Sequence, residues 1–311
     1  MTSILTVTAE DIIEGALIKA GIVPQGSDIP AADHEFTLKT LNYLLKTLQT
    51  DGFHLWTKTE GVIFLTQGTQ KYDLGVSGDH SSTSFVNVSA TAAIASGLAV
   101  IPVVSTGMTA ADFIGIELDD GTRQWSTIST VDSAAQVTIA DVLTDDVASG
   151  NTIFTYTNKL PRPLRVIDGR QTRTTTNTEI PMTIWNRQQY FEQNDKTTQD
   201  SVLNFYYSPQ LATGEFYVWP TSNNVNQYLN ITFIRPADIV VNNSDAPDIP
   251  SEWVQPLIDM LAAKILPSYK IDPARQQILN EDAAISKDEA LGFDHEFASM
   301  FIGPDQQGRN W

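Results

Sequence analysis

Helical periodicity at both ends of the chain, with strand periodicity between them, constrains the fold more than any other feature. A short helix is predicted from a capping box at Thr8 and Asp11 to a closing glycine, Gly21. A longer helix should run from about Pro30 to Asp51, because leucines recur there at spacings of three and four. One apolar stripe on each lets the two helices pack together. The leucines are Leu38, Leu41, Leu45 and Leu48.

The C-terminal third repeats the helical pattern. An apolar face begins at the sequence Ser-Glu-Trp of residues 251–253, and Pro256 fits only in the first turn of that helix. Pro267 should kink or end it, and Asp272-Pro273 should begin a last helix that runs to about Leu291. The shared apolar face consists of Trp253, Leu257, Met260, Leu261, Ile265 and Tyr269.

Strand patterns follow the first helical pair. Residues 62–65 and 71–74 are separated by a polar turn, which predicts a hairpin. The aromatic joint before them, Phe53, Leu55 and Trp56, is expected to be core where helix and sheet meet, rather than a ligand pocket. Further strands are predicted at 202–209, 214–220 and 228–236, after a short helix at 185–193.

The composition changes between about Asp79 and Thr157, where small residues and aspartate dominate and lysine is absent. Strands are predicted at 98–104, 136–140 and 151–157, with a hairpin at 114–128 whose turn is Asp120-Gly121. Eight acidic residues against Arg123 give residues 80–157 a net charge of −7. This segment reads as a separate, acidic β domain.

These patterns together predict an α+β protein. We expect a helical bundle from the N- and C-terminal helices, a strand-rich region, and an inserted all-β domain. The expected division is a core of residues 1–79 and 158–291, an insertion at 80–157, and a C-terminal arm at 292–311.

Composition and charge exclude several classes of protein. The 37 acidic and 19 basic residues give a net charge of −18, which opposes non-specific binding to nucleic acid or anionic membranes. Cysteine is absent, so there is no disulfide framework and no thiol chemistry. The N-terminus lacks a secretion signal and the longest apolar stretch, 98–104, is too short to cross a bilayer. We expect a soluble protein made in the cytoplasm.

One short segment of this acidic chain is basic. Residues 159–173 contain five cationic side chains and a single acid, Asp168. Two interpretations remain open: a solvated strand face paired with acids of the same subunit, or a contact with another subunit or with phosphate. The cations are Lys159, Arg162, Arg165, Arg170 and Arg173.

No catalytic residue, metal or cofactor is expected. The sequence Asp-His-Glu-Phe occurs at 33–36 and 294–297, but neither copy has the second histidine of a zinc-binding HExxH helix. A P-loop, a GxGxxG motif and a GxSxG elbow are absent. Asp119 and Asp120 are adjacent before a glycine, which is typical of a tight turn rather than of a glycosidase pair. The scattered histidines are His34, His54, His80 and His295.

Five segments of the chain occur in an order that is typical of one family of proteins. They are a leucine helix ending at Asp51-Gly52 and followed by Leu55-Trp56 and Tyr72-Asp73-Leu74, then GIELDDGTRQWSTI, GNTIFTYTNKLPRPLRVIDGR, LNFYYSPQLATGEFYVWP and APDIPSEWVQPLIDMLAAKILPSYKI. This order resembles the head-to-tail adaptor proteins of short-tailed bacteriophages, including versions with an extra β domain. The resemblance covers most of the chain, and each piece is an aromatic and proline pattern.

The resemblance implies a structural protein of the virion neck or tail, assembled in the host cytoplasm. Twelve copies would form a ring beneath the portal, extend the DNA channel and dock the next tail component, a nozzle or hub. Genomic DNA would pass without specific binding, no membrane would be involved, and the channel lining should be net negative. Residues 80–157 are expected to face outward and either to decorate the ring or to contact tail fibres.

The last twenty residues form the expected portal-binding arm. They contain glycine, proline and isolated aromatics but no long periodic pattern. The alternative is that these aromatics fold back on their own helices. The side chains expected to bind the portal are Phe293, Phe297, Phe301 and Trp311.

Two other functions remain open from the sequence. One is a phage-associated carbohydrate-binding or carbohydrate-active β protein that holds glycan on exposed tryptophans such as Trp125. The other is a different ring of the same virion, such as a tail-tube or head-completion protein. An enzyme should lose turnover when one carboxylate is changed, whereas an adaptor should have no turnover and should assemble on a portal.

Overall fold

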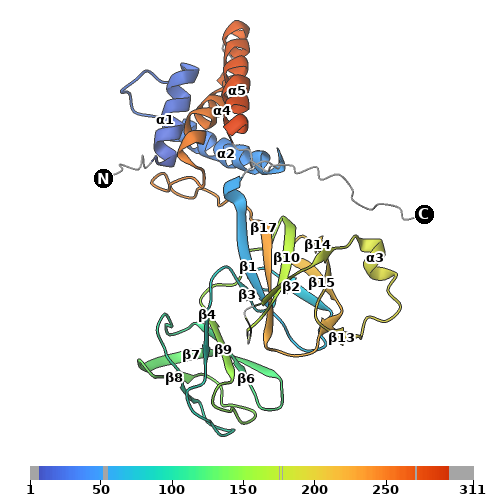
Figure 1. Ribbon diagram of the computed structural model, residues 1–311. Helices are drawn as coiled ribbons and strands as arrows, with labels where there is room; N and C mark the ends of the chain where they lie inside the picture. The colour runs from blue at the N-terminus through green and yellow to red at the C-terminus, as the bar shows by residue number, and fades with distance from the viewer. Residues whose placement is uncertain (1–6, 52–54, 175, 177, 270–271, 294–311) are drawn as a thin grey trace, which may run out of the picture. The chain divides into compact units, whose positions relative to one another are not determined.

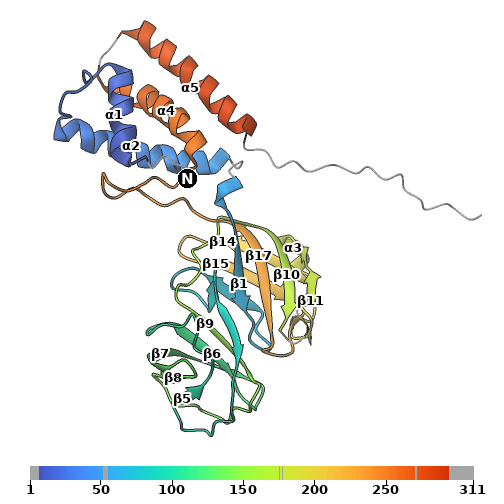
Figure 2. The same ribbon diagram turned by 60° about the vertical axis from the view of Figure 1, so that its left-hand side comes forward.

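The computed structural model describes residues 7–51, 55–174, 176, 178–269 and 272–293. The fold is α+β, as expected, with sheets predominating over helices. The chain separates into two compact units (Figures 1 and 2), a helical unit of residues 1–56 and 237–311 and a strand unit of residues 57–236. The three-part division drawn from composition is a different partition and stays a prediction.

The helical unit takes its helices from both ends of the chain. Helix α4 lies against α1, α2 and α5, and α1 also contacts α2 (Figure 2). Short 3-10 turns lie at Gln49–Asp51, Leu55–Thr57, Ser251–Trp253 and Leu266–Tyr269. The helices are α1 (Ala9–Ala20), α2 (Ala31–Leu48), α4 (Val254–Ile265) and α5 (Pro273–Phe293).

The local signals at the helix ends are confirmed. The Thr8 hydroxyl accepts from the backbone N–H of Asp11 at 3.3 Å, and the Asp11 carboxylate accepts from the backbone N–H of Thr8 at 2.8 Å. Gly21 closes α1 with a left-handed φ of 74°, which costs glycine little. Pro256 lies in the first turn of α4 and Pro267 lies in the 3-10 turn that follows it.

The helical unit has a single hydrophobic core. The predicted leucine face of α2 is buried, with Leu38 partly covered and with Leu44 as an addition that the prediction left out. Trp56 packs on Trp253 with ring centroids 5.3 Å apart, so this part of the aromatic joint is core, as expected. Phe53 lies outside the described residues.

The strand unit contains three larger sheets and one small one. Their strand orders are β11-β10-β17-β1-β3, β12-β14-β15-β2, β4-β9-β6-β7-β8-β5 and β13-β16, and a short helix, α3 (Arg187–Phe191), lies after β12 (Figure 1). The strands are β1 (Lys58–Phe64), β2 (Lys71–Leu74), β3 (Ser81–Ser82), β4 (Val86–Ser89), β5 (Val100–Pro102), β6 (Phe113–Glu117), β7 (Arg123–Ser133), β8 (Gln136–Ile139), β9 (Thr152–Tyr156), β10 (Arg165–Arg173), β11 (Thr178–Pro181), β12 (Thr183–Ile184), β13 (Gln199–Asp200), β14 (Asn204–Pro209), β15 (Gly214–Trp219), β16 (Thr221–Ser222) and β17 (Gln227–Ile234).

The hairpin predicted at 62–74 is wrong. Both strands form, but β1 pairs with β17 and β3, whereas β2 pairs with β15 in a different sheet. Strands β1 and β17 pair along their whole length, from Lys58 opposite Ile234 to Phe64 opposite Tyr228. That long ladder satisfies far more backbone groups than a short local hairpin would, so the distant partner prevails.

The five-stranded and four-stranded sheets share a core. Ile63 from β1 and Phe233 from β17 are fully buried in the same cluster as Phe205 from β14 and Phe216 from β15. Gly61 makes room in this cluster, because a Cβ there would lie 2.2 Å from the Leu160 side chain and 2.9 Å from Phe233.

Replacing Gly61 with alanine should therefore destabilise the strand unit. We expect a loss of about 1–3 kcal/mol in the free energy of unfolding, the usual cost of overpacking a core. Hydrogen exchange at β1 and β17 measures it. Gly292→Ala is the matched control, because that helical position opens onto free space, and alanine there should be neutral or stabilising by up to about 1 kcal/mol. An equal change in the free energy of unfolding for both variants would contradict the claim that a Cβ at position 61 overpacks the core.

The six-stranded sheet has its own core and follows the predicted strands closely. Ile114, Ile128 and Ile153 are buried in a cluster built only from residues 86–153. Strands β6 and β7 form the predicted hairpin. Gly121 has a φ of 82° in its turn, a conformation that favours glycine.

Candidate functional site

The cationic side chains of residues 159–173 contact different groups in the structure. Arg170 forms ion pairs with Glu60 at 2.9 Å and Glu179 at 3.4 Å, and the hydrogen bond to Glu60 raises the Arg170 pKa. Arg162 donates to the backbone oxygen of Gln210 at 3.2 Å, and Arg165 is exposed. Pairing with an acid of the same chain therefore applies to Arg170, one of the five.

The two remaining cations lie in different surroundings. Lys159 donates to the backbone oxygen of Gly78, and its ammonium group lies 5.6 Å from the centre of the Phe113 ring. Arg173 donates to the Ser201 hydroxyl at 2.8 Å and lines a polar cavity of about 370 Å³. The run is thus no single anion-binding cluster within one chain, and its contact with another subunit or with phosphate stays a prediction.

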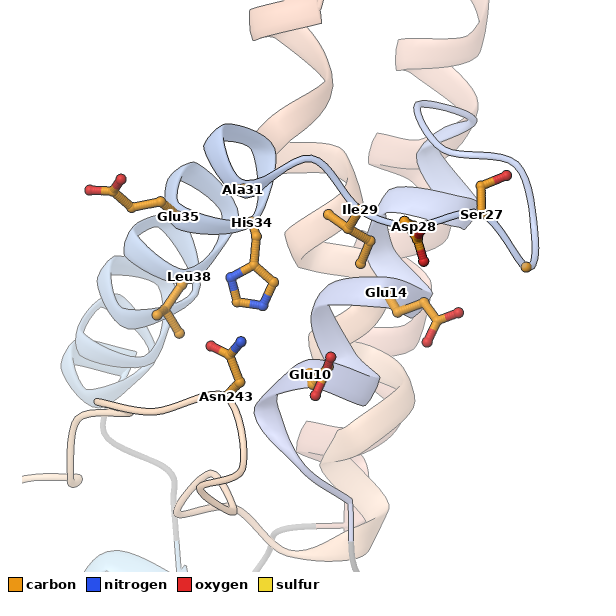
Figure 3. Close-up of a pocket in the computed structure, with 11 residues that line it drawn as sticks. Glu10, Glu14, Ser27, Asp28, Ile29, Ala31, His34, Glu35, Leu38 and Asn243 are labelled. Atoms are coloured by element: carbon orange, nitrogen blue, oxygen red, sulfur yellow. The ribbon is translucent and has the colours of Figure 1, made fainter.

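A large cavity lies in the helical unit, between α1 and α2. It has a volume of about 710 Å³ and is lined by carboxylates from both helices and from the loop between them. Figure 3 shows the His34 ring pointing toward Asn243 and Glu10, while Glu35 points away. The His34 Nε2 is shielded from solvent and has no hydrogen-bond partner in the described part of the chain. The carboxylates that line the cavity are Glu10, Glu14, Asp28 and Glu35.

This cavity does not have the arrangement of a metal site. Across the ranges that the structure describes, no three His, Asp or Glu side chains are grouped to hold a metal ion. Asp33, the first residue of the first Asp-His-Glu-Phe sequence, accepts a hydrogen bond from the Tyr269 hydroxyl at 2.7 Å. That residue therefore joins two helical segments, and the second copy, at 294–297, lies outside the described residues.

The adjacent carboxylates Asp119 and Asp120 are turn residues, as predicted. Asp120 accepts from the backbone and the hydroxyl of Thr122 at 2.8 and 2.7 Å. Asp119 instead accepts from the backbone of Ala148 and the side chain of Asn151, both at 2.8 Å. Each carboxylate is held by its own local network, so the two do not form a catalytic pair.

An aromatic cluster joins the six-stranded sheet to β1 and β17. Phe64 of β1 lies 5.0 to 5.5 Å, between ring centroids, from Phe85, Trp125, Phe154 and Tyr156. Residues 80–157 therefore share a buried aromatic contact with the strands around them, although they have a core of their own. The prediction that residues 80–157 are a separate β domain stays a prediction.

Trp125 differs from the exposed platform that glycan binding needs. Its ring stacks on His80 with centroids 3.8 Å apart and planes 5° apart. On β6, a Cβ at Gly115 would lie 2.6 Å from the same ring. Trp125 is therefore half-buried, and it lines two small cavities of about 220 and 160 Å³. Trp125 is thus less exposed than the carbohydrate alternative expected, and that alternative stays a prediction.

His80 is held neutral by this environment. Its Nδ1 lies 2.6 Å from the Tyr156 hydroxyl. Burial lowers the pKa of His80 to about 4, and the positive charge of Lys159 acts in the same direction. The folded protein therefore binds a proton here less readily than the unfolded chain, whose histidine titrates near 6.5.

Stability should fall as the pH drops from about 6.5 toward 4, because the unfolded chain gains a proton at His80 that the folded chain excludes. After allowing for solvent screening of this partly exposed ring, we expect a loss of about 1 kcal/mol at this site between pH 7 and pH 5. Unfolding free energies at pH 7 and pH 5 measure it. His80→Phe should flatten this part of the profile. An unchanged pH dependence in that variant would exclude His80 as its source.

Arg123, the one basic residue of residues 80–157, supports the same joint. Its guanidinium lies 4.0 Å from the centre of the Phe154 ring and donates to the backbone oxygen of Val225 at 2.7 Å. Burial lowers its pKa to about 9, and the nearby Glu117 opposes this shift, so Arg123 is protonated at neutral pH. The residue is a structural cation that ties β7 to the segment before β17.

The structure describes none of the predicted portal-binding side chains. Phe297, Phe301 and Trp311 lie outside the described residues, and Phe293 ends α5 without a described side chain. Sequence analysis missed four exposed apolar side chains on α2 and α5, whose signal was a spacing of seven residues in each helix. They are Phe36, Tyr43, Ile278 and Ile285.

The described helices include none that is both long enough and apolar enough to span a membrane. Comparison with known proteins adds no relative: no protein-family model matches the chain, and no curated protein matches it at a significant level.

Proposed function

We propose that this chain is a head-to-tail adaptor of a short-tailed bacteriophage. Twelve copies form a ring beneath the portal, extend the DNA channel and dock the tail nozzle or hub below. The protein is a structural component of the virion without catalytic activity, and residues 80–157 face tail fibres or other parts of the tail.

The observation that carries this proposal is the helical core built from both chain ends. Helices α1 and α2 share one hydrophobic cluster with α4 and α5, so along the chain the strand unit is inserted between the N- and C-terminal helices. This is the order of helices, strands, extra β segment, strands and helices on which the resemblance rests. The order of elements supports the function by analogy of fold, and the position of the chain in the virion tests it.

The charge distribution also favours a conduit for DNA. The chain has a net charge of −18, and in the strand unit Arg170 is neutralised by two carboxylates. A channel must pass phosphate without trapping it, and basic linings bind it strongly at low salt. We therefore expect a net negative lumen. A continuous lining of lysine and arginine would contradict this.

A reconstruction of the intact virion neck tests the position of the ring. Density for this chain directly below the portal supports the proposal, and density elsewhere in the particle overturns it. Binding of the purified chain to portal-bearing heads that lack it is the biochemical counterpart. Truncation after Leu291 should leave a folded chain that no longer binds such heads. A large fall in melting temperature would instead show that the arm folds back on its own helices.

A further inference from the structure

Helix α2 presents a second apolar stripe that its own core does not use. Phe36 and Tyr43, seven residues apart, are 38% and 71% exposed. Lys39 and Lys46 share this side of the helix, also seven residues apart, and both are exposed. The stripe is therefore aromatic with basic neighbours, in a chain that is otherwise strongly acidic.

Helix α5 presents a stripe of the same spacing and the opposite charge. Ile278 and Ile285 are 58% and 59% exposed, while the opposite side of α5 buries Leu279, Ala283 and Ala290. The exposed acids Glu281 and Asp288 follow each isoleucine by three residues. On α2, each lysine follows its aromatic residue by the same three positions.

The two stripes match better in one direction than in the other. Seven residues of helix span about 10.5 Å, so the apolar pair of one helix can face the apolar pair of the other. In a parallel arrangement Lys39 then lies beside Glu281 and Lys46 beside Asp288. In an antiparallel arrangement with the same apolar contacts, Lys39 would still lie near Glu281, but Lys46 would lie level with Arg275 and lose its acidic partner. Charge complementarity therefore favours the parallel register.

We propose that α2 of one copy packs in parallel on α5 of the next copy. Phe36 contacts Ile278 and Tyr43 contacts Ile285, while the lysines of α2 face the acids of α5. The two surfaces differ, so the contact is head-to-tail and can continue from copy to copy until a ring closes. This inference rests on the proposed ring and identifies the surfaces that form it.

Existing contacts within the chain leave both stripes available. Lys39 pairs with Glu35 at 2.7 Å on the helix surface, an exposed pair that rearranges at little cost. Lys46 donates to the backbone oxygen of Ala237 at 2.7 Å, which holds its ammonium group near the helix while the residue remains exposed. Phe36 touches Tyr269 edge-on at 6.2 Å and keeps its outer face open.

Engineered cysteines test the register, because the natural chain has none. A disulfide needs Cβ atoms roughly 3.5–4.5 Å apart. The full-length variant Tyr43→Cys/Ile285→Cys should form a ladder of linked oligomers on mild oxidation at high protein concentration. The matched variant Tyr43→Cys/Ile278→Cys should form about tenfold less, because its thiols are one heptad apart in the parallel register. The reverse preference overturns the register, and the absence of a ladder in both variants overturns the interface.

Charge reversal tests the pairing of surfaces. Lys39→Glu/Lys46→Glu makes both stripes acidic, and Glu281→Lys/Asp288→Lys makes both basic. Each variant alone should associate at least about tenfold more weakly than the natural chain in sedimentation velocity. A one-to-one mixture should recover association, because each variant then meets a complementary neighbour on both sides. A mixture that stays dissociated overturns the proposal.

Two controls keep these outcomes interpretable. Glu192→Lys/Asp200→Lys makes the same change in net charge as Glu281→Lys/Asp288→Lys, at exposed sites of the strand unit, and should leave association unchanged. Melting temperatures of all variants exclude unfolding as the cause of a loss. Self-association through these stripes without binding to portal-bearing heads would overturn the adaptor function and leave this inference standing. If the chain binds such heads and neither charge reversal changes its association, the adaptor function stands and the proposed contact between α2 and α5 is overturned.

Discussion

Replacing Phe64 with alanine is expected to lower the free energy of unfolding of the strand unit by about 3–5 kcal/mol. Phe64 is 2% exposed and is the central ring of the aromatic cluster. Its ring lies within 5.5 Å, between centroids, of the four other rings named above. Truncation removes the buried ring and leaves a cavity between two sheets that are each held by their own ladders.

Hydrogen exchange at β1 and β9 measures this loss on both sides of the cluster. Leu211→Ala is the matched control, because Leu211 is 98% exposed and its truncation should change stability by less than about 0.5 kcal/mol. A loss below about 1 kcal/mol for Phe64→Ala would mean that the surrounding rings close the gap, and that the cluster is not the joint between the sheets.

Excision of residues 80–157 is expected to damage the strand unit unless the exposed surface is also changed. A short Gly-Ser linker in their place removes Phe85, Phe154 and Tyr156, and leaves Phe64 and Tyr228 uncovered. It also removes β3, which pairs with β1 at the edge of the five-stranded sheet. We expect aggregation, or a fall in melting temperature of at least about 10 °C.

A compensated variant separates this contact from any wider role of the segment. Val62→Thr and Phe64→Thr replace the apolar residues of β1 that face the cluster, whereas Ile63 faces the other core. The excised chain with both changes should regain solubility, and on the proposed function it should still bind portal-bearing heads. Loss of binding in this soluble variant would show that residues 80–157 belong to the ring scaffold rather than decorate it.

The candidate site shows why proximity along the chain does not predict a cluster in space. The five cations of residues 159–173 lie partly before and partly within β10, whose side chains alternate between the two faces of the sheet. A register shift between Val166 and Asp168 changes this alternation within the strand. Sequence could show the basic composition, but only the pairing of β10 decides that Arg170 meets Glu60.

The stacking of Trp125 on His80 could not be predicted from the sequence either. Its place in the hairpin was predicted, and strand alternation alone allowed either an exposed or a covered ring. His80, from a segment outside the six-stranded sheet, covers the ring by stacking. A contact between residues so far apart along the chain depends on the packing of sheets, which no local pattern encodes.

The sequence by itself determined the α+β class, the capped start and glycine end of α1, the leucine face of α2, the prolines that bound α4, and the β6–β7 hairpin. These features depend on neighbours within a few residues, where capping, turn chemistry and periodicity act. Only the tertiary structure decided the partners of β1 and β2, the dispersal of the basic run, and the aromatic joint around Phe64. Those outcomes are set by which distant surfaces bury the most apolar area and satisfy the most backbone groups, a competition that strand patterns alone leave open.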